Sequence, residues 1–197
     1  MRRLLVTCCV LLVLVAGNTA HAQSIGFKAG GSLANQEFDP EAERNSLSGF
    51  AGGGFLRFGF GRMGIQLEVL SLTKGSESVT DFSETKLTYI EVPLLLHLPL
   101  TVGQSFAPYV IVGPSLAFDI NCEVEVGDVP QDCGEREKVD FGVSTGGGLG
   151  VAAGPGALLL EGRYTWGLKN ISEDPAAEIK NRTALFIIGY EIPIGRR

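Results

Sequence analysis

Residues 106–121 read FAPYVIVGPSLAFDIN, and this stretch decides the fold. Its even positions are all apolar, whereas its odd positions include tyrosine, glycine, serine and aspartate. Successive side chains of a β-strand point to opposite faces, so a period of two predicts a strand with one apolar and one polar face. The even positions are Phe106, Pro108, Val110, Val112, Pro114, Leu116, Phe118 and Ile120.

The same alternation recurs from Gln23 to the end of the chain, with no convincing helical period between. In residues 85–98, for example, Ile90 and Leu94 share one face and Glu91 lies on the other. The recurrence predicts eight strands. Their predicted spans are 23–34, 46–60, 63–74, 85–98, 106–121, 138–153, 156–168 and 181–195.

The predicted connections alternate between long and short. A soluble sandwich or a lipocalin-like carrier would also show alternating strands, so the connections decide between the architectures. Bacterial transmembrane barrels have an even number of strands, long outer loops and tight periplasmic turns. The sequence therefore predicts an all-β fold, an eight-stranded antiparallel up-and-down transmembrane β-barrel. The long connections are 35–45, 75–84, 122–137 and 169–180, and the short ones are 61–62, 99–105 and 154–155.

The N-terminus has the features of a secretory signal peptide. Arg2 and Arg3 precede an apolar run that ends near Gly17, and a small-residue site ends at Ala22. The run is shorter than the roughly 20 residues that a membrane-spanning helix needs. We therefore expect residues 1–22 to be a signal peptide and residues 23–197 to form the barrel, exported to a bacterial outer membrane.

The net charge limits the classes of molecule that the chain is expected to bind, and the cysteine content indicates a disulfide. The formal net charge of −6 becomes −8 once Arg2 and Arg3 leave with the signal. Such an acidic chain is not expected to bind nucleic acid, which requires a basic face. Cys122 and Cys133 are the cysteines that remain, and export places them where a disulfide persists, so a bridge between them is predicted.

The polar faces of the predicted strands carry charges that must lie inside the barrel. Eight strands enclose only enough room for side chains, so these charges have to neutralise one another. The three cations balance the five acids only in part, which predicts ordered water or a protonated carboxyl in the interior. The predicted interior charges are Lys28, Arg57, Glu68, Glu91, Asp119, Asp140, Glu161 and Arg163.

Aromatic residues near the strand ends are expected to form girdles at the two membrane interfaces. Phe118, Tyr164 and Trp166 fall toward the outer rim. Phe58, Phe60, Phe106 and Tyr190 fall toward the periplasmic rim.

Prolines within the predicted strands conflict with a closed barrel, because each removes a donor from the ladder. We expect a β-bulge or a strand end at each of them. They are Pro93, Pro108, Pro114 and Pro193.

Two motifs resemble the PorT-like outer-membrane β-barrel family. They are YIEVPLLL at residues 89–96 and PYVIVGPSL at residues 108–116. Weaker likeness comes from VDFG at 139–142, the glycines at 146–148, Arg163-Tyr164 and GLKNI at 167–171. The resemblance implies an eight-stranded membrane barrel and says little about the biochemical task.

Few residues suggest catalysis or cofactor binding. His97 is the one histidine left after His21 departs, and the glycines at 146–148 lack the Gly-Lys-Ser/Thr of a phosphate loop. Acidic residues in the long loops lack calcium-loop spacing. We expect no metal and no cofactor.

The sequence thus favours a non-enzymatic outer-membrane protein with a structural or interaction role. Its partners would be outer-membrane lipid and a protein bound through the long acidic outer loops. One alternative is an outer-membrane enzyme that processes lipid or protein through His97 or the interior carboxylates. The other is the soluble lipocalin-like carrier, against which the inward charges argue.

Overall fold

The computed structural model describes residues 22–39, 44–60, 62–78, 83–100, 106–126, 129–131, 139–168 and 178–194. The predicted signal peptide lies outside these residues except for Ala22, and Cys133 and the side chain of Cys122 also lie outside them. Within the described part, no helix is long and apolar enough to cross a membrane. The strands are β1 (Ala22–Asp39), β2 (Arg44–Phe60), β3 (Met63–Ser78), β4 (Ser83–Pro99), β5 (Phe106–Val126), β6 (Val129–Gln131), β7 (Val139–Ala153), β8 (Gly156–Gly167) and β9 (Glu178–Pro193).

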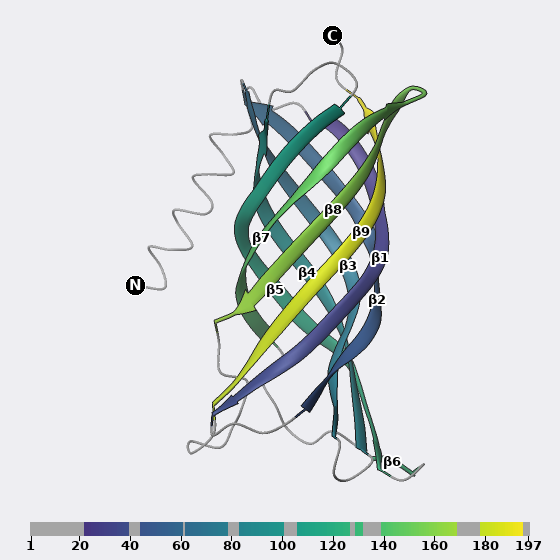
Figure 1. The fold of residues 1–197 in the computed structure, drawn as a ribbon, viewed down its shortest axis with the longest axis vertical. Helices are drawn as coiled ribbons and strands as arrows, with labels where there is room; N and C mark the ends of the chain where they lie inside the picture. The colour runs from purple at the N-terminus through teal and green to yellow at the C-terminus, as the bar shows by residue number, and fades with distance from the viewer. Residues whose placement is uncertain are drawn as a thin grey trace.

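Eight of these strands close into an antiparallel barrel, which confirms the predicted fold class. Each long strand pairs with its neighbours in the chain, and β1 pairs with β9 to close the ring. The strands are strongly tilted and wind around the barrel axis (Figure 1). The short strand β6 stands apart from the ring and pairs only with the end of β5.

The strands run further than the alternation predicted, and they do so at the end of the barrel where the long connections lie. β5 continues to Val126, and β3 continues to Ser78. The predicted spans of these two strands end at residues 121 and 74, whereas backbone pairing continues beyond both points. The hydrophobic pattern therefore marks the lipid-facing part of each strand and not its full length.

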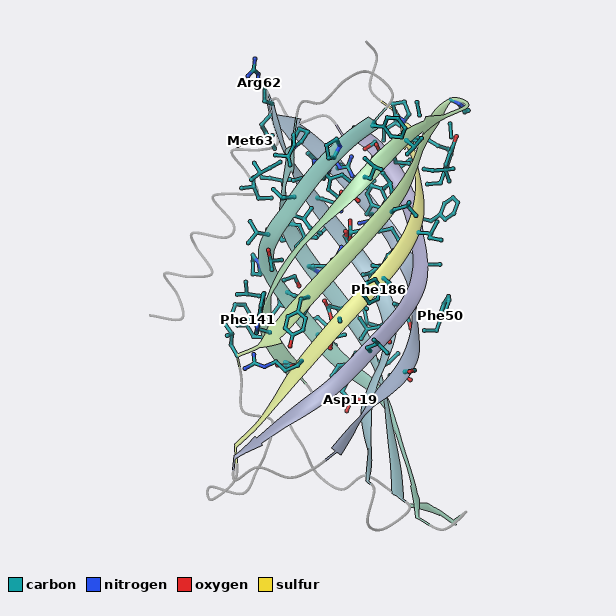
Figure 2. The ribbon with its side chains drawn as sticks, in the orientation of Figure 1. Phe50, Arg62, Met63, Asp119, Phe141 and Phe186 are labelled. Atoms are coloured by element: carbon teal, nitrogen blue, oxygen red, sulfur yellow. The ribbon has the colours of Figure 1, made fainter. Side chains whose placement is uncertain are left out.

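The barrel is apolar outside and mixed inside. Leu94, Leu160 and Ile188 are among the outward side chains that are exposed, while their neighbours in sequence point inward and are buried. Figure 2 shows Phe50, Phe141 and Phe186 pointing away from the barrel wall. This polarity is the opposite of what a soluble lipocalin-like carrier requires, so that alternative is wrong.

Apolar side chains fill part of the interior in two clusters. One is centred on Leu70, Leu72 and Tyr89, and the other on Phe55 and Leu95. Leu70 and Leu72 of β3 lie at inward positions of the strand, in line with Gln66 and Glu68. They are part of the buried packing and do not face lipid.

The prediction of bulges or strand ends at the prolines is right at Pro193 and wrong at Pro93 and Pro114. Pro193 is the last residue of β9. Pro93 and Pro114 lie within β4 and β5, where pairing is interrupted between Pro93–Ser115 and Leu96–Val112 and then resumes in the same register. Each proline removes only one backbone donor, and the lost pairs fall side by side, so the ladder opens locally without shifting.

The turn between β7 and β8 consists of Gly154 and Pro155, with Ala153 paired to Gly156. Gly154 has a φ of 60°, a conformation that favours glycine, at the first position of a two-residue hairpin loop. Arg62 and Met63 lie at this same end of the barrel (Figure 2). β1 begins and β9 ends there too (Figure 1), so the short turns and both ends of the closed sheet share one rim.

Candidate functional site

The most prominent polar feature is a cluster of four buried charges in the barrel interior, formed by Lys28, Glu68, Glu161 and Arg163. Every one of these side chains is 0% exposed. Lys28 Nζ lies 2.9 Å from Glu68 Oε1 and 2.7 Å from Glu161 Oε2. Two cations thus face two carboxylates, and the cluster is neutral as a unit.

Arg163 supplies the second cation of the cluster. Its Nη2 lies 2.8 Å from Glu68 Oε2 and 2.6 Å from Glu161 Oε1. Glu68 is on β3 and Arg163 on β8, four strands apart in either direction around the ring. The ion pair therefore crosses the full diameter of the interior. We call Lys28, Glu68, Glu161 and Arg163 the lumen cluster.

Two uncharged side chains extend the lumen cluster. Tyr109 donates its hydroxyl to Glu161 Oε2 at 2.9 Å, and Gln66 donates Nε2 to Glu68 Oε1. A buried carboxylate needs several hydrogen-bond donors. Tyr109 and Gln66 therefore supply donors to carboxylate oxygens in addition to those that the two cations supply. The result is one connected network from β1, β3, β5 and β8.

Glycines of β7 make room for this network. Gly146 and Gly148 face inward, and a Cβ at Gly148 would collide with the Tyr109 ring and the Leu160 carbonyl. At Gly146 a Cβ would meet the backbone of Gly162 and Arg163. The glycine run is therefore a packing requirement, because a larger residue at Gly148 would push Tyr109 away from Glu161.

A second ion pair lies closer to the rim with the short turns. Arg57 Nη1 is 2.6 Å from Glu191 Oε2, and Arg57 Nε donates to Gln66 Oε1 at 2.8 Å. Both charged side chains are partly exposed, at 13% and 19%. Phe55 lies between the two groups, with Lys28 Nζ 5.1 Å and Arg57 Cζ 5.5 Å from its ring centroid, so cation–π contacts join the pair to the lumen cluster.

The other predicted interior acids lie away from the lumen cluster, toward the end with the long connections. Glu91 and Asp140 are buried and line a small internal cavity. Asp119 is half-buried, and Figure 2 places it near that end of the barrel. The structure thus brings five of the eight predicted charges into two adjoining groups and leaves three in a separate layer.

His97 is buried and faces inward near the short-turn rim. Its ring centroid lies 4.6 Å from that of Tyr109. Among the buried hydroxyls, Ser144 is hydrogen-bonded to Thr165 at 2.8 Å. Within the described residues, no group of three or more His, Cys, Asp or Glu side chains is placed to hold a metal ion.

The predicted interfacial aromatics are outward or half-exposed. Tyr164 and Trp166 form an edge-to-face pair with centroids 4.7 Å apart near the far end of β8. Phe60, Phe106 and Phe118 are exposed, and Phe58 is half-buried.

Tyr190 is half-buried and donates its hydroxyl to the Ala153 carbonyl at 2.9 Å. It thereby ties β9 to the turn between β7 and β8. Sequence reasoning did not assign further outward aromatics to the girdles, namely Phe27, Phe50, Phe141 and Phe186.

Four members of the interior network were missed by the sequence analysis: Phe55, Gln66, Tyr109 and Glu191. Gln66 and Tyr109 stand at inward positions of their strands, so the alternation already indicated their direction. Glu191 stands between Tyr190 and Ile192, at an inward position near the end of β9. A search for every polar residue on an inward face would have found three of the four.

Comparison with known proteins agrees with this architecture. The family model for the outer membrane protein beta-barrel domain matches residues 18–173. The chain belongs to this family of outer-membrane barrels. Membership indicates the bacterial outer membrane as its location, with lipid around the apolar outer face. No curated protein sequence matches the chain.

Solved structures of other outer-membrane barrels resemble this one in fold. Neisserial surface protein A (NspA), from Neisseria, is 14% identical, with a TM-score of 0.62, and the alignment covers 89% of this chain and 99% of that one. Ail from Yersinia pestis is also 14% identical, with a TM-score of 0.49 and coverage of 87% and 100%. At such low identity the likeness concerns the fold alone.

Proposed function

We propose that this outer-membrane barrel is a non-enzymatic structural or interaction protein that presents its long acidic loops outside the cell. The observation that carries the proposal is the lumen cluster. Ion pairs that cross the full diameter, with every charged side chain 0% exposed, fill the interior with protein atoms. A filled interior does not suit general passage of solutes, which leaves the loops as the functional surface.

The orientation of the loops supports the same function. Barrels of this class place tight turns on the periplasmic side and long loops on the outer side. The connection at 122–137 carries six acidic residues and both remaining cysteines, which we propose to be bridged. A bridge across this loop would stiffen it as a surface for contact with a protein partner.

The contacts of His97 support a structural role for that residue. A histidine that acts as a general base must be within hydrogen-bond reach of its nucleophile. His97 instead packs against the Tyr109 ring, and Ser144 bonds to Thr165. We infer that His97 fills space beneath the lumen cluster and takes no part in catalysis.

Within the family, the motifs at 89–96 and 108–116 favour the narrower PorT-like group.

Conductance measurement tests the closed interior. We expect the protein, reconstituted in planar bilayers, to give no sustained channels in 1 M KCl. A variant that empties the lumen cluster, Arg163→Ala with Lys28→Ala, should raise conductance if it remains folded. Sustained open channels in the wild-type protein would overturn the proposal and indicate a pore.

Crosslinking on intact cells tests the loops. A photo-crosslinking residue at Asp128 should yield a discrete adduct, whereas the same residue at Arg62, on the short-turn rim, should not. Adducts from Arg62 alone would place the contact surface in the periplasm, and none from either position would contradict an interaction role. Turnover of lipid A, phospholipid or peptide that disappears in a folded His97→Ala protein would establish the enzymatic alternative.

A further inference from the structure

Arg182 on β9 carries a charge on the otherwise uncharged outer face of the barrel. Its neighbour Thr183 is buried and points inward, so Arg182 points outward, where it is half-buried. Every other outward strand position whose side chain the structure describes holds an uncharged residue. Ionisable residues are disfavoured on a surface that faces lipid, and those that occur there usually serve a function.

Arg182 lies at the end of this face from which the long loops leave. It is the direct strand partner of Trp166. β8 ends at Gly167 and β9 begins at Glu178, so the pair lies beside the connection between these two strands. Tryptophan and tyrosine side chains of membrane barrels gather at the depth of the lipid headgroups. Arg182 therefore lies where headgroups and not acyl chains surround the barrel.

Two aromatic rings stand beside the arginine. Trp166 and Tyr164 contact each other edge to face, with ring centroids 4.7 Å apart, and both remain more than a third exposed. Their mutual contact restricts the orientation of both rings. A fixed apolar surface next to a guanidinium suits an amphipathic ligand, whose hydrocarbon part packs on the rings while its anionic group pairs with Arg182.

The guanidinium indicates which anionic group fits. Arginine binds phosphate through two parallel hydrogen bonds, and such charge-assisted bonds are stronger than neutral ones. Arg182 also interacts within the protein. Since a guanidinium has five N–H donors, it can keep a protein contact and bind a phosphate at the same time. At headgroup depth, the phosphates available to it are those of lipids.

We propose that Arg182, together with Trp166 and Tyr164, binds the phosphate-bearing headgroup of a lipid of the lipid A type in the outer leaflet. The choice of leaflet rests on the outward orientation of the long loops given under the proposed function. The phosphate would pair with Arg182, and the hydrocarbon part would lie along the outer face of β8 and β9. This site is distinct from the loops that contact a protein partner.

Titration of bisphosphorylated lipid A into the full-length protein in dodecyl maltoside micelles tests this proposal. Trp166 is the single tryptophan of the chain, so its fluorescence reports on the site directly. We expect a saturable change in emission. Lipid A from which both phosphates have been removed should bind at least about 10-fold more weakly, because the charge-assisted hydrogen bonds are lost. Equal affinity of the wild-type protein for the two lipids would overturn the site.

Arg182→Gln should weaken binding of the bisphosphorylated lipid by about the same factor. The matched control is Arg62→Gln, which removes an arginine from the opposite rim and should leave the affinity unchanged. Undiminished binding by folded Arg182→Gln would contradict the role of the guanidinium. If this variant does not fold, the comparison of the two lipids on the wild-type protein decides the matter.

Inorganic phosphate distinguishes a lipid headgroup from a free anion. Added alone, it should leave Trp166 emission unchanged, because it has no hydrocarbon part to pack on the rings. A saturable change at the affinity of the lipid would show that the site takes free phosphate, and the lipid assignment would be wrong.

Discussion

Arg163 on β8 places its Nη2 atom 2.8 Å from both carboxylate oxygens of Glu68 on β3, the strand diametrically opposite. Neither residue is near the other in sequence, and both side chains are fully buried. Coulombic attraction is strong where water is excluded, but the same exclusion makes an unpaired charge costly. The stability of the barrel therefore depends on keeping this pair intact.

Arg163→Met should destabilise the barrel by about 3–5 kcal/mol, because Lys28 alone would then face two buried carboxylates. Urea unfolding in lipid vesicles, followed by Trp166 fluorescence, measures the change. The matched control is Arg62→Met at the exposed turn, which should stay within about 0.5 kcal/mol of wild type. Equal stability of Arg163→Met and wild type would contradict a structural role for the lumen cluster.

Two glycine substitutions should have different effects on the free energy of unfolding. Gly148→Ala would drive a methyl group into Tyr109 and the Leu160 carbonyl and should cost about 1–3 kcal/mol. At Gly162, on the outward face, a Cβ meets nothing within 4 Å among the described residues, so Gly162→Ala should be neutral or stabilising by up to about 1 kcal/mol. The same unfolding measurement applies. A larger loss at Gly162 than at Gly148 would show that the interior is not tightly packed.

Charge on the lipid face should be penalised according to depth. Phe186 is 65% exposed in the middle of β9, and Ile192 lies near the end of the same strand. Phe186→Arg should cost about 2–4 kcal/mol and Ile192→Arg about 0–1 kcal/mol, since the penalty falls toward the interface. Folding free energies in vesicles provide the comparison. Equal penalties at both positions would place the membrane boundary elsewhere on the barrel.

Electrophoresis tests closure of the ring directly. Unboiled protein should migrate faster than boiled protein and should be recovered with the outer membrane. Gly30→Val would force a side chain into the Phe186 carbonyl at the junction of β1 and β9 and should abolish the fast form. Gly162→Ala serves as the control and should retain it. A fast form in Gly30→Val would show that the junction tolerates a larger spacing.

Strand number, closure and the direction of most side chains could be predicted because each depends on local alternation. Residues 106–121 show this clearly, since every even position faces outward. Which charges would meet could not be predicted, because the partner of Arg163 depends on how far the strands are staggered around the ring. Alternation contains no information about stagger. For the same reason the separation of Glu91 and Asp140 from the lumen cluster emerged only from the register.

The junction between β1 and β9 gives the lumen cluster a role in the order of folding. Lys28 comes from the first strand of the chain and Glu161 from the penultimate one, and the two residues are 133 positions apart in the sequence. These two side chains cannot meet until β9 has paired with β1, so the cluster is among the late contacts to form. Its bonds must also break before the junction can separate. The buried charges would therefore slow the unfolding of the closed barrel more than they speed its folding.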